Sequence, residues 1–188
     1  MSNSDKEKEE KEEKTVPIND WKLGKLIGES KFSKVRLLSC ESKVNDAFVG
    51  KFVKKTDSRA CYDIQNEIKF LKMLKHDNIV EIITSFETET HIIAVLKFYE
   101  AKSLDKLLDK KKRIEESECK DLFKQILSGL QYLKSHDVVH RDIKPANIFL
   151  EANMSKVQAS FHNFDEDCFI YDVKLGDFGF ATLSTDEF

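Results

Sequence analysis

His140-Arg141-Asp142-Ile143-Lys144-Pro145-Ala146-Asn147-Ile148 is the stretch that decides how the rest of the chain is interpreted. It sets a carboxylate, an amine and an amide at fixed offsets, just before the apolar run Ile148-Phe149-Leu150. Asp142 can accept a proton from an attacking hydroxyl, Lys144 can neutralise charge on a transferring phosphoryl group, and the Asn147 amide oxygen can bind Mg²⁺. The pattern therefore indicates a loop built for chemistry.

The residue types match the His-Arg-Asp-x-x-x-x-Asn loop of eukaryotic protein kinases, and the chain resembles that family. The resemblance implies an α+β fold of two lobes: a β-rich N-lobe with one helix, and a helical C-lobe that is cut short after an Asp-Phe-Gly motif. The kinase-like part would span residues 21–188, with the N-lobe and hinge over 21–99 and a partial C-lobe over 100–188.

Composition limits the class of protein. The 188 residues include 40% hydrophobic and 35% charged residues and carry a net charge of −3, so neither nucleic acid nor an anionic membrane is expected as a partner. There is no apolar run of membrane-spanning length and no signal-peptide core. The four cysteines are widely spaced without a C-x-x-C pair, which argues against disulfides and zinc. We expect a cytoplasmic or nuclear protein, and the sequence leaves the oligomeric state open.

Residues 1–20 form a tail rich in Lys and Glu, with no apolar residue between Met1 and Val16. Such a segment buries too little surface to offset its chain entropy, so the sequence predicts a disordered tail. A docking or localisation role for this tail stays open as the alternative.

From Trp21 onward, short β-type runs separated by polar turns predict strands. The expected strands cover residues 23–27, 35–38, 48–53, 80–86, 91–96 and 173–175. Apolar residues at helical spacing predict a helix through Ile64 to Leu74 and a longer one over 119–133, whose apolar face we assign to the core. Ser103 is expected to cap a further helix that begins at Leu104.

The segment Gly28-Glu-Ser-Lys-Phe-Ser-Lys-Val35 resembles the glycine-rich loop of kinases, Gly-x-Gly-x-Phe-Gly-x-Val. Small residues are needed where backbone approaches phosphate. Ser30 and Ser33 stand where the family has glycine, and they lack the freedom of glycine at positive φ. The nucleotide contacts implied for this hairpin are Ile27, Gly28, Glu29, Ser30 and Val35.

Glu67 lies on the same helical face as Ile64 and Leu71, which points its carboxylate inward. A carboxylate among apolar residues requires a cation, and Lys51, on an expected strand, is the candidate. In the family, this pair holds the α- and β-phosphates of the nucleotide. The predicted catalytic set is therefore Asp142, Lys144, Lys51 and Glu67.

Other roles come from the resemblance alone. Leu96 corresponds to the residue that gates the adenine pocket, and Lys97-Phe98-Tyr99 corresponds to the hinge, whose backbone would bind adenine. Phe149 would sit under the adenine, and Val49 is a further implied nucleotide contact. In Asp177-Phe178-Gly179, which follows a predicted strand, Asp177 would bind Mg²⁺ together with Asn147.

The interval from Asn147 to Asp177 is longer than the kinase pattern, and the surplus falls at about residues 155–171. It is either an inserted surface loop or translated non-coding sequence. Without it, Asn153-Met154 would join Val173 in a tight hairpin.

We therefore expect an ATP-dependent serine/threonine protein kinase that uses ATP and Mg²⁺ and acts on protein substrates. Lys144, two residues after Asp142, is typical of the serine/threonine class. Stretches at residues 48–53, 103–113, 147–150 and 173–182 resemble polo-like kinases, which would imply a cell-cycle role at the spindle pole or centrosome. The alternative is a catalytically inactive fragment or pseudokinase that binds nucleotide or a partner. The chain taken alone is expected not to phosphorylate proteins.

Overall fold

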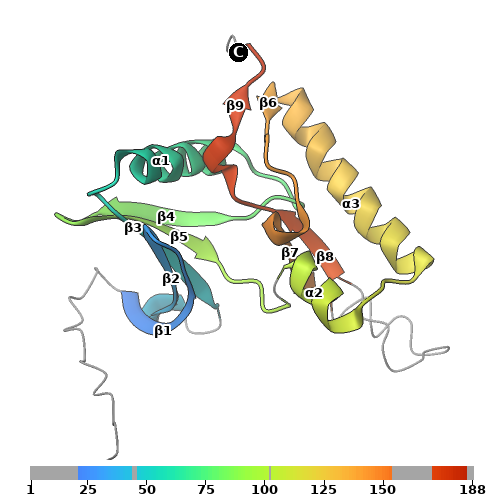
Figure 1. Cartoon of the computed structure of the whole chain (residues 1–188), viewed down its shortest axis with the longest axis horizontal. Helices are drawn as coiled ribbons and strands as arrows, with labels where there is room; N and C mark the ends of the chain where they lie inside the picture. Colours follow the sequence, from blue (N-terminus) through green and yellow to red (C-terminus); the bar gives the residue numbers. More distant parts are fainter. Residues whose placement is uncertain (1–20, 44–45, 102, 154–170, 186–188) are drawn as a thin grey trace, which may run out of the picture.

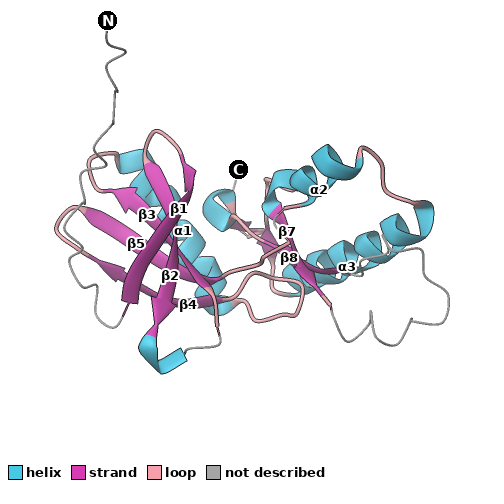
Figure 2. Cartoon of the chain, turned by 90° about the horizontal axis from the view of Figure 1, so that it is seen from below, coloured by secondary structure: helices cyan, strands magenta, loops and turns pink. Residues whose placement is uncertain are grey.

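The computed structural model describes residues 21–43, 46–101, 103–153 and 171–185. These residues form two lobes, a sheet with one helix on the left of Figure 2 and two helices with short strands on the right. The expected α+β architecture of two lobes is thereby confirmed. The predicted tail, residues 1–20, and residues 154–170 of the predicted insertion lie outside the described residues. None of the described helices is long and apolar enough to cross a membrane.

A five-stranded antiparallel sheet forms the first lobe, with the strand order β1-β2-β3-β5-β4 (Figure 1). Its strands are β1 (Trp21–Glu29), β2 (Ser33–Cys40), β3 (Phe48–Lys54), β4 (Ile82–Glu87) and β5 (His91–Lys97). The predicted strands are confirmed, except that β4 begins at Ile82 and not at Val80. The Val80 N–H instead donates to the Leu175 carbonyl at 2.9 Å, which ties this residue to the second lobe.

Helix α1 (Ser58–Met73) packs on one face of the sheet. It begins where the Asp57 carboxylate accepts a hydrogen bond from the Ala60 N–H at 2.7 Å, which satisfies one of the free donors of the first turn. Its apolar face packs Ile64 against buried side chains of β3 and β5, among them Val53 and Ile92. This packing fixes the position of the helix relative to the sheet. It thereby also fixes the direction of the side chains on the inner face of the helix.

The second lobe contains α2 (Leu104–Lys111), α3 (Glu116–Ser135) and four short strands. These strands pair antiparallel as β6 (Val138–Val139) with β9 (Thr182–Leu183), and as β7 (Ile148–Ala152) with β8 (Tyr171–Leu175). Tyr171, at the end of the predicted insertion, pairs with Ala152 inside this hairpin. Ser103 is the N-cap residue of α2, as expected, although its hydroxyl donates to the Asp105 carboxylate and makes no cap hydrogen bond to a backbone N–H.

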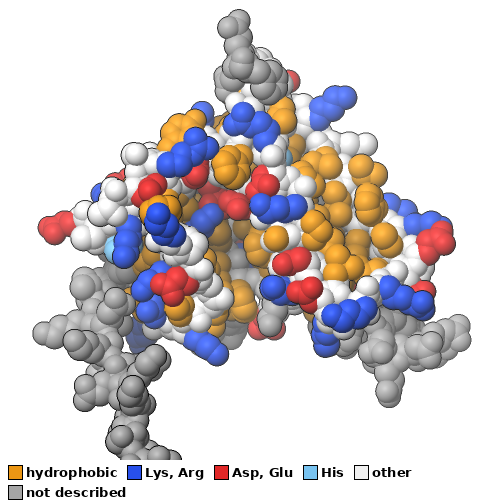
Figure 3. Space-filling view, in the orientation of Figure 1, with side chains coloured by type: hydrophobic (Ala, Val, Ile, Leu, Met, Phe, Trp, Pro, Cys, Tyr) orange, Lys and Arg blue, Asp and Glu red, His pale blue; other side chains and the backbone are white. Residues whose placement is uncertain are grey.

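Helix α3 is only partly covered. Leu122, Ile126 and Leu133 are buried, as the apolar pattern predicts. Phe123 and Leu127, which the same pattern assigned to the core, are 58% and 53% exposed. Figure 3 shows hydrophobic side chains gathered on the face of the molecule over this helix. The helical period identified the apolar face correctly. That face is wider than the part of the helix that the described residues cover.

The end of α1 and the loop after it join the two lobes. Phe70, Leu71 and Leu74 belong to the same buried cluster as Leu150 and Leu175 of the second lobe. The backbone continues the connection, since the Leu175 N–H donates to the Asn78 carbonyl at 2.9 Å, and the Asn78 side chain donates to the Val173 carbonyl at 3.0 Å. The lobes therefore share one continuous core behind the cleft that separates them.

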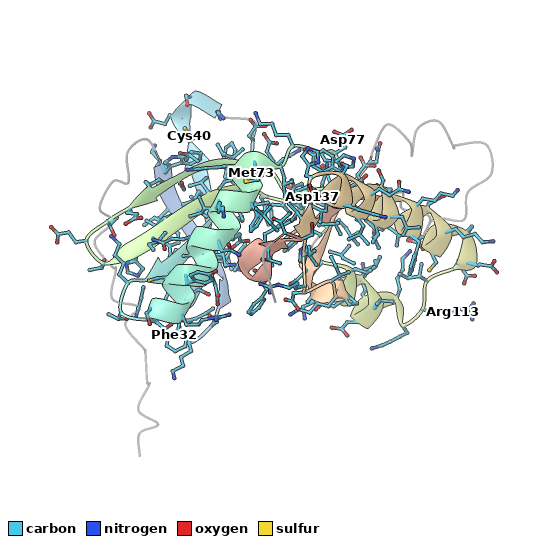
Figure 4. The ribbon with its side chains drawn as sticks, turned by 90° about the horizontal axis from the view of Figure 1, so that it is seen from above. Phe32, Cys40, Met73, Asp77, Arg113 and Asp137 are labelled. Carbon is cyan, nitrogen blue, oxygen red and sulfur yellow. The ribbon has the colours of Figure 1, made fainter. Side chains whose placement is uncertain are left out.

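Replacing Phe70 by alanine tests this junction. Phe70 is 1% exposed, so Phe70→Ala should lower the free energy of unfolding by about 3–5 kcal/mol, through lost burial and the cavity left behind. Met73, near the end of the same helix (Figure 4), is 50% exposed, and Met73→Ala should change the same quantity by less than about 1 kcal/mol. Urea denaturation of both variants measures the difference, and equal effects would contradict the shared core.

Candidate nucleotide and catalytic site

A chain of three charged side chains connects the lobes across the cleft. The Lys51 Nζ lies 2.6 Å from the Glu67 Oε2 and 3.3 Å from the Asp177 Oδ1. Lys51 stands on β3, Glu67 on α1, and Asp177 follows β8, so one ammonium group joins the sheet, the helix and the second lobe. The predicted pair of Lys51 and Glu67 is present, and Figure 3 shows acidic and basic side chains at the hollow between the lobes.

Burial and charge act in opposite directions on this pair. Glu67 is 2% exposed, and burial raises the pKa of its carboxyl, while Lys51 opposes that effect. Burial alone would lower the pKa of Lys51, but Glu67 and Asp177 outweigh it and hold that pKa above its usual range. Lys51 is therefore a permanent cation at neutral pH, and it can contact an additional anion without losing its proton.

The catalytic-loop residues converge on the Asp142 carboxylate. The Lys144 Nζ lies 3.0 Å from its Oδ1 and 2.8 Å from its Oδ2, and the Asn147 side-chain amide donates to the same Oδ2 at 2.8 Å. The hydrogen bond from Lys144, together with that from Asn147, lowers the pKa of Asp142. The carboxylate is thus held ionised, in one orientation, as a hydrogen-bond acceptor.

Asn147 and Asp177 are brought together by backbone contacts. The Gly176 N–H donates to the Asn147 carbonyl at 2.9 Å, which places the residue before Asp177 against the catalytic loop. Asp177 adopts the left-handed conformation, with φ 61° and ψ 72°, an uncommon backbone that aspartate tolerates better than most residues. Since the Asn147 amide nitrogen is engaged by Asp142, its amide oxygen is the atom left for a cation. A carboxylate and an amide oxygen are hard donors of the kind that Mg²⁺ binds.

His140 has a structural role that the sequence analysis did not assign. It is 3% exposed and its ring contacts Phe178 at a centroid distance of 4.6 Å. Its Nε2 lies 3.0 Å from the Gly176 carbonyl oxygen, an acceptor, while its Nδ1 accepts the Asp142 N–H at 3.3 Å. These partners require a proton on Nε2 and none on Nδ1, so the ring is neutral. Burial agrees, because it lowers the pKa of His140.

Asn66 is the second residue that sequence reasoning missed. Its side-chain nitrogen lies 3.4, 3.0 and 2.8 Å from the carbonyl oxygens of Phe178, Gly179 and Ala181, in that order. Since all three neighbours are acceptors, the atom that faces them must be the nitrogen, which fixes the orientation of the amide. Asn66 precedes Glu67 and so fastens α1 to the segment after Asp177. Glu67 can be identified in the sequence as a carboxylate on an apolar helical face. No residue pattern indicates a role for the adjacent Asn66.

The β1–β2 hairpin carries five predicted nucleotide contacts. Ile27 and Glu29 are exposed, while Gly28 and Val35 are half-buried. Ser30, also exposed, closes the tip with Ser33, since the Ser30 N–H donates to the Ser33 carbonyl at 2.8 Å and the two hydroxyl groups lie 2.7 Å apart. No described residue of this hairpin has a positive φ. The turn therefore does not need the conformational freedom of glycine, which Ser30 and Ser33 lack.

The hinge and base-side residues lie between the lobes. Val49 pairs with Leu96 across β3 and β5, and both are half-buried. The Lys97 ammonium pairs with the Glu151 carboxylate at 2.9 Å. The Tyr99 ring is buried, with its hydroxyl accepting the Glu81 N–H at 3.2 Å, and it lies 6.5 Å from the Phe149 ring between centroids. These two hinge side chains therefore engage protein groups. The Lys97 and Phe98 N–H groups also donate, to the Glu81 and Ala47 carbonyls at 3.0 and 2.9 Å, so an adenine base would use the other backbone groups of the hinge.

Comparison with known proteins agrees with this arrangement. The protein kinase domain model matches residues 21–187, and the chain belongs to the protein kinase family. Among curated relatives, a SNF1-like protein kinase, ssp2, of Schizosaccharomyces pombe is 30% identical over 90% of this chain and 27% of its own length. The probable serine/threonine-protein kinase KCC4 of Saccharomyces cerevisiae is 30% identical over 90% of this chain and 16% of its own length. The chain thus spans about a quarter or less of these relatives.

The neutral state of His140 predicts a pH dependence of stability. Its pKa is lowered in the folded protein, whereas an unfolded histidine titrates near about 6.5. The unfolded state therefore takes up a proton first, so the stability due to this group is full above about pH 6.5 and is lost as the pH falls below it. Urea denaturation at pH 7.5 and pH 5.5 should show a smaller acid loss for His140→Asn than for the parent. Equal losses would exclude His140 as the titrating group.

The three acceptors around Asn66 predict the effect of an almost isosteric change. Asn66→Asp would place a carboxylate oxygen against three carbonyl oxygens, so the free energy of unfolding should fall by about 1–3 kcal/mol or more. Amide hydrogen exchange at residues 178–181 should also become faster. Gln65→Glu makes the same chemical change at an exposed neighbour and should have little effect on either measurement. Similar losses in both variants would mean that added charge, and not the lost donors, is the cause.

Proposed function

We propose that this chain carries the nucleotide-binding and phosphotransfer site of an ATP-dependent serine/threonine protein kinase. The observation that supports this most directly is the chain of contacts from Glu67 through Lys51 to Asp177, at 2.6 and 3.3 Å. A buried carboxylate holds the lysine, and the lysine points toward the carboxylate that enters the cleft. A nucleotide phosphate placed there would meet a cation whose position is already fixed.

Each side chain then has a role that follows from its surroundings. Asp142 has a lowered pKa and is a weak base, so it acts by orienting the substrate hydroxyl as an acceptor and takes the proton late in the transfer. Lys144, which contacts both Asp142 oxygens, neutralises charge that develops on the phosphoryl oxygens. Lys51 holds the nucleotide phosphates, and Glu67 keeps Lys51 in place.

Asp177 and Asn147 are the residues that would hold Mg²⁺. Both offer oxygen donors, and the contact between Gly176 and Asn147 keeps them on the same side of the cleft. When bound, Mg²⁺ supplies charge neutralisation on the nucleotide phosphates. Lys51 already contacts Asp177, so the chain's own share of the work is to set the position of that carboxylate.

The preference for serine and threonine rests on Lys144 and on the relatives, one of which is named a probable serine/threonine-protein kinase. The polo-like assignment gains no support from the relatives named above and stays a prediction carried by the four stretches alone. Cytoplasmic or nuclear localisation likewise stays a prediction. The inactive-fragment alternative has no specific observation in its favour, since all the residues of the predicted catalytic set are present.

Thermal unfolding with and without Mg²⁺ and ATP tests the nucleotide site. The parent should be stabilised by Mg²⁺-ATP, and Lys51→Met should lose most of that shift, because the fixed cation is removed. Asp177→Asn should lose the Mg²⁺-dependent part only. Lys54→Met, on the same strand but exposed, should behave like the parent. Equal shifts in the parent and in Lys51→Met would contradict the role of the lysine.

Transfer of radiolabelled phosphate from ATP to casein tests the chemistry separately. Where the parent transfers phosphate, Asp142→Asn should reduce the rate by about 100-fold or more while leaving the Mg²⁺-ATP thermal shift in place. If Asp142→Asn still binds Mg²⁺-ATP but no longer transfers phosphate, Asp142 acts in the reaction and not in nucleotide binding. A parent that binds nucleotide and transfers nothing, even within the whole protein, would favour the inactive alternative.

A further inference from the structure

A second cavity, of about 580 Å³, lies behind the hinge and outside the nucleotide cleft. Its walls are the end of α1, the loop from His76 to Glu81, the start of β4, the hinge, and Lys174 of β8. Figure 4 labels Asp77, which lines this cavity, on the opposite side of the molecule from Phe32 at the tip of the β1–β2 hairpin. Lys97 and Tyr99 of the hinge line it, but none of Asp142, Lys144, Lys51 and Glu67 does.

The charge around the cavity is uneven. Four lysines line it, Lys72, Lys75, Lys97 and Lys174, against the two carboxylates of Asp77 and Glu81. Lys72 and Lys75 form no ion pair with any residue that the structure describes. Both lie on the last turn of α1 or just after it, where the helix dipole favours cations. Their ammonium groups are available to an incoming anion.

The other two lysines are held together by one carboxylate. The Lys97 Nζ lies 2.9 Å from one oxygen of Glu151, and the Lys174 Nζ lies 3.7 Å from the other. Both ammonium groups also lie over the Tyr99 ring, at 5.7 and 5.9 Å from its centroid. The Lys174 Nζ also donates to the Asp77 carbonyl at 2.7 Å. The two lysines and Glu151 together carry one net positive charge in the wall of the cavity.

The remaining wall is apolar. Leu71, Leu74 and Ile79 contribute to it, and the Tyr99 ring forms part of the wall next to the hinge. The volume falls in the range of binding pockets and exceeds the needs of a single small anion. A ligand that satisfies this cavity must bring several negative charges, spaced from α1 to β8, and apolar groups between them.

We propose that the cavity behind the hinge is a docking site for an acidic segment of a partner protein, in which Asp or Glu side chains alternate with apolar ones. The acidic side chains would meet Lys72, Lys75 and the pair of Lys97 and Lys174, while the apolar ones would pack on half-buried Ile82. Exposed Asp77 and Glu81 would repel a ligand whose negative charges are concentrated at one point. Carboxylates spread along a peptide can avoid these two residues. The proposal does not depend on the phosphotransfer activity.

Fluorescence anisotropy with two labelled hexapeptides tests the proposal. The chain should bind Asp-Glu-Leu-Asp-Glu-Ile and not the basic counterpart Lys-Arg-Leu-Lys-Arg-Ile, and the binding should weaken as salt is raised. The double variant Lys72→Glu, Lys75→Glu should bind the acidic peptide at least about tenfold more weakly. The same variant should gain affinity for the basic peptide, a change that simple unfolding cannot produce.

A matched double variant, Lys25→Glu with Lys54→Glu, provides the control. Both lysines are exposed, β1 is the edge strand opposite β4, and Lys54 pairs with His91 at the end of the sheet away from Lys97. It changes the net charge equally and should keep the acidic-peptide affinity within about twofold of the parent. Equal weakening in both double variants would overturn the proposal, because attraction by net charge would then suffice.

Two competitors separate the remaining possibilities. Inorganic phosphate at the same concentration as the peptide should not displace it, and displacement would show a small-anion site, which overturns the peptide proposal. Mg²⁺-ATP should not displace it either, since a displaced peptide would be bound in the nucleotide cleft. Thermal unfolding of each variant establishes that a loss of binding is not a loss of fold.

Discussion

The burial of one carboxylate governs this structure. Glu67 is 2% exposed, and an ionised group in that environment is tolerated only with a cation in contact. Lys51 supplies the cation at 2.6 Å, which fixes the helix relative to the sheet, because the two residues stand on different elements. The same ammonium reaches Asp177, so the second lobe is positioned by the same requirement. The same contacts therefore neutralise the buried charge and assemble the candidate site.

A second set of contacts passes through a residue with no side chain. The Gly176 carbonyl lies 3.0 Å from the His140 ring nitrogen, and its N–H donates to the Asn147 carbonyl. A Cβ on this residue would lie 2.7 Å from the Phe149 ring and 2.8 Å from a Val80 methyl group. The backbone can approach the catalytic loop this closely only because nothing projects from it. Asp177 follows directly, and its position depends on this fit.

Much of the fold and part of the site could be predicted from the sequence. The alternation of the strands and the helical period near Glu67 reflect local burial, and the residue types of two motifs indicated Asp142, Asn147 and Asp177 as candidates. The role of Asn66 could not be predicted, since its three partners lie more than a hundred residues away and are backbone atoms. At Ser103 the N-cap position was predicted correctly, but the orientation of its hydroxyl toward the nearby Asp105 carboxylate was not. Contacts that depend on tertiary structure leave no periodic trace.

The paired serines at the tip of the β1–β2 hairpin affect the entropy of ligand binding and its temperature dependence. A glycine-rich tip is conformationally free before a ligand arrives and loses that freedom on binding. Here Ser30 and Ser33 already bond to each other through backbone and hydroxyl groups. The tip is pre-organised, so nucleotide binding should carry a smaller entropic penalty and a weaker temperature dependence than in a loop with three glycines. Serine in place of glycine at this tip would thus change the entropy of nucleotide binding.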